Sequence, residues 1–203
     1  MLAKGLWPRY SAAFLDSIRS VYLEGFQAFL AADPECIRTS YTWSSFNGYS
    51  IQFPLNQAID KALHTWEDQT KARDSLEIVN QILINGADAN SVVEGGYASD
   101  DPACEQKKWE FVAMGPFPHT PLDAVADFVI HSQSLSDPDY IREEGKRMLA
   151  LSYAAQLSNL LVAHDGILLP VERMLHLDPK RFTNDTVTPE QLHLARKVHL
   201  ISL

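Results

Sequence analysis

Apolar residues recur at helical spacing over three long regions of the chain. The first of these regions is residues 9–32. The second, residues 54–85, begins with Pro54 and closes at Gly86, in keeping with the tendency of helices to start at proline and stop at glycine. The third covers residues 121–163. Such spacing is typical of helices with one buried face, so we predict antiparallel helix pairs in all three regions.

Two further helical segments follow toward the C-terminus. Residues 167–179 keep the helical spacing, and Thr188 then supplies an N-cap, with Pro189 at the first helical position. The apolar residues of the last segment are Leu192, Ala195, Val198 and Ile201. We expect this stripe to cover the exposed end of the preceding helices.

Two irregular segments, residues 37–53 and 90–119, separate the helical regions. Both are rich in aromatic residues, serine and glycine, and both contain short alternations of polar and apolar residues. Asn47 and Gly48 form the dipeptide favoured in tight hairpin turns. Because long structureless loops are uncommon in compact domains, we predict ordered β-hairpins or binding loops here.

Residues 76–90, with the sequence LEIVNQILINGADAN, closely resemble the second helix and following turn of an ankyrin repeat. Gly86 would supply the positive φ that ends the helix. Residues 53–58 and 120–125 resemble ankyrin first helices, and residues 23–30 and 154–161 align as degenerate second helices.

The resemblance implies an all-α fold: an ankyrin-like helical solenoid of about three repeats, with elongated β-hairpin fingers and a C-terminal capping helix. The single domain, residues 1–203, would divide into units at roughly 9–53, 54–119 and 120–178, and a cap at 179–203. A family repeat has about 33 residues, so these units must carry large insertions. The alternative is an unrelated helical domain that contains one ankyrin-like turn.

Composition and charge exclude several classes of partner. The net charge is −9, and the basic pairs Lys107-Lys108 and Arg196-Lys197 are isolated and expected on the solvated surface, so neither nucleic acid nor a membrane surface is an expected partner. Only two cysteines are present, without metal-ligand spacing, which predicts reduced thiols and no metal. No signal peptide or membrane span is evident, and the expected location is the cytoplasm.

One pattern of charged residues stands out on two of the predicted helices. Aligning the two Pro-Leu helix starts superposes Asn56, Asp60 and His64 on Asp123, Asp127 and His131. Each triplet runs i, i+4, i+8 and so follows one helix face. In the ankyrin family Asp60 and Asp127 would face the concave groove, and Arg19 would complete an Arg19–Asp60–Asp127 ladder. The cluster could bind a metal or exchange protons, recognise a partner, or form ordinary solvated surface.

Aromatic residues gather in the two predicted hairpins. Tyrosine and tryptophan are favoured at the centres of interfaces, so they are candidate anchors for a partner, although they could instead cover a small core of their own. They are Tyr41, Trp43, Phe46 and Tyr49 in the first hairpin and Tyr97, Trp109, Phe111 and Phe117 in the second.

Together these patterns favour a binding module that recognises a protein or peptide through its groove and hairpins. The candidate binding residues are Arg19, Trp43, Phe46, Tyr49, Asp60, His64, Trp109, Phe111, Asp127 and His131. The sequence contains no standard catalytic or nucleotide fingerprint, so we assign no catalytic residue and no cofactor. The alternative is an enzyme or small-molecule-binding protein that uses the Asp/His cluster and aromatic residues as a pocket.

Overall fold

Three successive helix pairs form the body of the protein. The computed structural model describes residues 7–45, 48–96, 119–133, 141–177 and 188–203. The pairs are α1 (Trp7–Arg19) with α2 (Leu23–Ala32), α3 (Pro54–Leu63) with α4 (Gln69–Ile84), and α6 (Pro121–Gln133) with α7 (Glu144–Ala163). Helix pairs were predicted at these three places, and that part of the prediction is confirmed.

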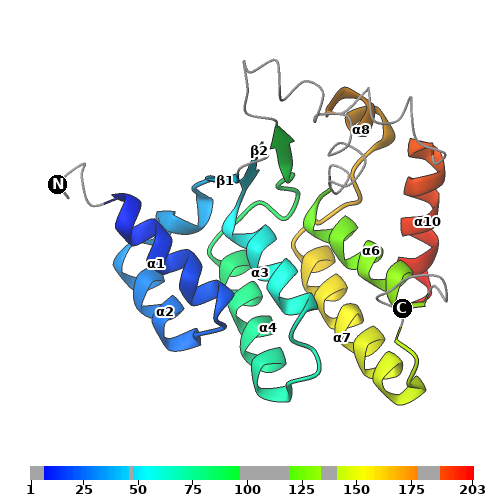
Figure 1. Ribbon diagram of the computed structural model, residues 1–203, viewed down its shortest axis with the longest axis horizontal. Helices are drawn as coiled ribbons and strands as arrows, with labels where there is room; N and C mark the ends of the chain where they lie inside the picture. Colours follow the sequence, from blue (N-terminus) through cyan, green and yellow to red (C-terminus); the bar gives the residue numbers. More distant parts are fainter. Residues whose placement is uncertain (1–6, 46–47, 97–118, 134–140, 178–187) are drawn as a thin grey trace.

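The helices stack in two rows (Figure 1). Helices α1, α3 and α6 pack side by side in what we call the first row, and α2, α4 and α7 form the second row. Helix α10 (Pro189–Ile201) packs on α6 and continues the first row at its C-terminal end, next to the short helix α8 (Val171–Leu177). Each pair therefore contacts mainly the pairs next to it.

Local signals explain where several of these helices begin and end. The Asp68 carboxylate caps α4 by accepting hydrogen bonds from the N–H groups of Thr70 and Lys71 at 3.1 and 3.2 Å. Thr188 and Gln191 form a capping box at the start of α10. Gly86 follows α4 with φ of +87°, so the predicted left-handed stop is confirmed.

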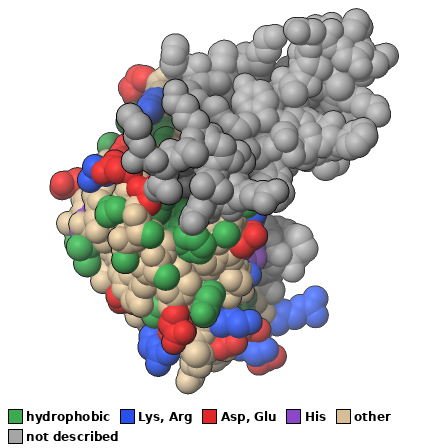
Figure 2. Space-filling view, turned by 90° about the vertical axis from the view of Figure 1, so that its left-hand side faces the viewer, with side chains coloured by type: hydrophobic (Ala, Val, Ile, Leu, Met, Phe, Trp, Pro, Cys, Tyr) green, Lys and Arg blue, Asp and Glu red, His purple; other side chains and the backbone are tan. Residues whose placement is uncertain are grey.

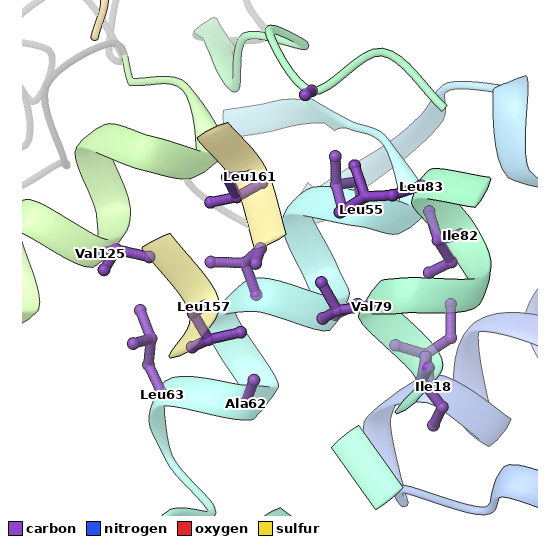
Figure 3. Packing of buried hydrophobic residues seen from close by; sticks show 14 of the residues in the cluster. Ile18, Leu55, Ala62, Leu63, Val79, Ile82, Leu83, Val125, Leu157 and Leu161 are labelled. Carbon is purple, nitrogen blue, oxygen red and sulfur yellow. The ribbon is translucent and has the colours of Figure 1, made fainter. Parts of the chain in front are cut away.

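A continuous hydrophobic core fills the space between the rows (Figure 3). Leu55 and Ile59 from the first row meet Val79 and Ile82 from the second row, and all four side chains are buried. Leu157 of α7 extends this core toward α6. The core residues of the helix pairs fall at the helical spacing seen in the sequence, which explains why that spacing predicted the pairs.

Three buried hydroxyl groups connect the first and second rows. The Tyr153 hydroxyl of α7 lies 2.6 Å from Ser75 Oγ and donates a hydrogen bond to the Ala72 carbonyl of α4 at 3.0 Å. Ser75 Oγ in turn lies 3.3 Å from Thr65 Oγ1, just after α3. Burial raises the pKa of Tyr153 above its ordinary value, although hydrogen bonds from Ser75 and Thr65 oppose that shift.

The helices agree with the predicted all-α class, but the prediction of two elongated β-hairpin fingers is wrong. In the part of the chain that is described, strands β1 (Tyr41–Ser45), β2 (Gly48–Gln52) and β3 (Glu94–Gly96) form a single three-stranded antiparallel sheet in the order β1-β2-β3. Residues 94–96 of the second predicted finger pair with the first, Tyr49 lying opposite Gly96 and Ile51 opposite Glu94, whereas residues 97–118 lie outside the described residues. The unpaired edge of β2 is the physical reason, since it accepts a third strand.

The last helix packs on α6 at the end of the array, but only part of its predicted apolar stripe is covered. Val198 and Ile201, which were expected to cover the end of the array, are 53% and 76% exposed. Figure 2 shows the opposite end of the array, formed by α1 and α2. On that surface hydrophobic side chains lie scattered among polar ones, and charged side chains gather toward the upper and lower edges of the view. Helix α10 thus turns Val198 and Ile201 to solvent, while Leu192 and Ala195 are half-buried.

Candidate functional site

The exposed face of α3 carries the first part of the candidate site. Seven of the ten residues of α3 are buried, whereas the side chains of Asp60 and His64 are 72% and 71% exposed. His64 Nδ1 lies 2.6 Å from the Asp60 carbonyl oxygen. Because a carbonyl oxygen only accepts hydrogen bonds, Nδ1 carries the proton in this contact, and Nε2 is the ring nitrogen left for another partner. These two residues form an exposed polar pair that can donate and accept hydrogen bonds.

Arg19 lies on the neighbouring helix of the same row. Its Nε donates a hydrogen bond to Gln57 Oε1 at 3.0 Å, which joins α1 to α3 three residues before Asp60. Its Nη1 also lies 3.6 Å from the Asp16 carboxylate. The Arg19–Gln57 hydrogen bond thus ties two first-row helices together.

Asp127 of α6 is engaged by a residue that the sequence analysis placed on the solvated surface. Arg196 of α10 donates from Nε and Nη2 to the two Asp127 carboxylate oxygens at 2.7 and 2.6 Å. The Arg196 side chain has no exposed area, and that of Asp127 is 32% exposed. The expectation of a solvated Arg196-Lys197 pair is therefore wrong for Arg196, because its guanidinium group is enclosed between α6 and α10.

Asp123 is the second carboxylate that Arg196 meets. Its Oδ1 lies 3.2 Å from Arg196 Nη1, and both side chains are fully buried. Burial alone would lower the pKa of Arg196. Its hydrogen bonds and ion pairs with Asp127 and Asp123 together raise the pKa by more than burial lowers it, so the net pKa lies above the ordinary value. Arg196 is consequently a permanent cation at this position.

Asn56 and Asp123, which the sequence alignment superposed, occupy equivalent places. Each accepts a hydrogen bond from the backbone N–H three residues earlier, that of Phe53 at 3.2 Å and that of Thr120 at 2.8 Å. Each also reaches the segment that follows its paired second-row helix: Asn56 contacts Ser91, and Asp123 accepts from the Leu169 N–H at 3.0 Å. The alignment of the two helices is therefore supported by matching contacts.

The remaining candidate residues are His131 and the aromatic residues of the two predicted hairpins. His131 is exposed near the end of α6, and Trp43 and Tyr49 lie in β1 and β2. Phe46, Trp109 and Phe111 lie outside the described residues. Among the residues that are described, no group of three or more His, Cys, Asp and Glu side chains is placed to hold a metal ion.

Comparison with known proteins gave no significant match. No protein-family model matches the chain, and no curated protein or solved structure does so. A separate search of the described helices found none that is both long enough and apolar enough to cross a membrane.

Proposed function

We propose that this protein is a binding module that recognises a protein or peptide through the exposed face of its first-row helices. The observation that carries the proposal is the Asp60–His64 pair on α3, exposed on a helix whose other face is packed into the core. A rigid helix that presents fixed polar groups loses little conformational entropy on binding, which favours recognition.

We also propose that the helix pairs are degenerate ankyrin repeats. The positive φ of Gly86, the matched contacts of Asn56 and Asp123, and the repeated stacking of helix pairs support this relationship. With only two cysteines in the sequence, the proposal places the protein in a reducing compartment such as the cytoplasm.

A double variant that removes the carboxylate and the imidazole of the exposed pair tests the binding role. Asp60→Asn combined with His64→Ala should weaken binding to the physiological partner, captured from extract of the native cell, by about 1–3 kcal/mol. The thermal midpoint should stay near that of the wild type, because both side chains are exposed.

Glu24→Gln is the matched control, because Glu24 is an exposed acidic residue on α2 in the second row. The control should retain wild-type affinity while the double variant loses it. Equal affinity of the double variant and the wild type for every captured partner would contradict binding through this face.

A further inference from the structure

Helix α10 docks with a charged side chain fully buried, while three of its apolar residues face solvent. The side chains that it turns toward the protein include Arg196, which is fully buried, and His193, whose Nδ1 lies 3.1 Å from the Leu169 carbonyl oxygen. Leu194, Val198 and Ile201 are 60%, 53% and 76% exposed. Leu200 packs against the core, so the buried charges act alongside apolar burial in holding α10.

The buried charges that hold α10 are incompletely satisfied. In the described structure, Asp123 Oδ1 and Arg196 Nη1 lack hydrogen-bond partners, although they form an ion pair at 3.2 Å. Taking charged groups out of water is costly, and their attraction repays this cost only with good geometry and satisfied hydrogen bonds. A buried ion cluster therefore adds little net stability to a docked helix. It does select for a helix that carries the matching cation, because a helix without that cation would leave the carboxylates buried and unpaired.

The surface beneath α10 is matched to a guanidinium group. At the equivalent position on α3 a neutral amide, Asn56, caps the helix and contacts the following segment. On α6, Asp123 accepts three hydrogen bonds with Oδ2 alone, from the N–H and hydroxyl of Thr120 and from the Leu169 N–H. Its second oxygen then faces Arg196, while Asp127 binds the same guanidinium through two parallel hydrogen bonds.

We propose that Asp123 and Asp127 form an arginine-receiving surface for a helix, and that α10 occupies it as a detachable internal ligand. A partner helix that carries an arginine on its docking face would compete with α10 for the same two carboxylates. The inference concerns α6 and α10 and does not rest on the role of Asp60 and His64 in the proposed function.

The direct test uses the helix itself as the probe. A fluorescent peptide of residues 188–203 is titrated into the full-length wild-type protein and into the Arg196→Met and Arg196→Lys variants. The peptide should bind both variants at least tenfold more tightly than the wild type, because their own α10 competes less well. A peptide with Met in place of Arg196 should bind none of the three proteins measurably.

Lys197→Met provides the matched control, since Lys197 is an exposed cation next to Arg196 on the same helix. This variant should bind the peptide no better than the wild type. Hydrogen exchange of the wild type gives a second measurement: the α10 amides should exchange at least tenfold faster than those of α3 and α4. Failure of the arginine peptide to bind any variant, or exchange of α10 as slow as that of α3 and α4, would overturn the proposal.

Discussion

Replacing Gly86 with alanine tests the turn that ends α4. The backbone of Gly86 has φ of +87°, a region that costs a residue with a Cβ about 1–2 kcal/mol. An added Cβ would also lie 2.8 Å from Arg38 Nη2. The guanidinium group can move away, but it would then lose its hydrogen bond to the Asn85 carbonyl at 3.3 Å, an exposed contact of small value.

We therefore expect Gly86→Ala to lower the free energy of unfolding by about 1–2 kcal/mol, and Gly86→Val to lower it further. For a chain of this size, each kcal/mol shifts the thermal midpoint by roughly 2–4 °C. Differential scanning calorimetry and urea titration of the same samples would measure both quantities.

Gly145 supplies the matched control. It lies in the first turn of α7, and a Cβ added there would meet no heavy atom within 4 Å. Gly145→Ala should raise the midpoint slightly, because alanine favours the helix by up to about 1 kcal/mol. If both alanine variants shift the midpoint by the same amount in the same direction, the argument from the left-handed turn is refuted.

Three further predictions concern two buried side chains, Tyr153 and Cys36. Tyr153→Phe should lower the free energy of unfolding in urea by about 1–2 kcal/mol, because it removes the hydroxyl that contacts Ser75 and Ala72, whereas an unchanged value would mean that these contacts contribute nothing. Burial and the nearby Asp33 charge raise the pKa of Cys36 to about 11, so in a Cys104→Ser background its alkylation at pH 8 should be much slower than that of a free thiol. The thiol of the unfolded chain ionises at a lower pH than the native thiol. The contribution of Cys36 to the free energy of unfolding should therefore be present below about pH 9 and be lost as the pH rises toward about 11. Alkylation of the native protein as fast as that of the unfolded chain would contradict the burial of Cys36.

The sequence predicted the helix pairs because their apolar residues keep a helical spacing and their ends carry proline, glycine and capping residues. Gly86 and Thr188 show how short-range signals of this kind locate the boundaries of an element. The alignment of Asn56 with Asp123 was also informative, since both side chains cap a first-row helix in the same manner.

Tertiary contacts could not be predicted in the same way. Nothing in the local sequence indicates that β3 adds to the edge of β2, because strand pairing depends on how the helix pairs position the two segments. The burial of Arg196 was missed because an isolated basic pair usually lies in solvent, and its two carboxylate partners are 69 and 73 residues away in the sequence. The sequence did contain one signal for a buried cation: the charged Asp123 stands at the position where α3 has the neutral Asn56.

The central claim is that a partner binds to the first row of helices. Hydrogen exchange of the protein with and without its captured partner tests this claim most directly, because it locates the bound surface without any substitution. We predict slower exchange in α1 and α3, strongest around Gln57–His64, with little change in α2, α4 and α7. Protection confined to α2, α4 and α7, with α3 unchanged, would contradict the account.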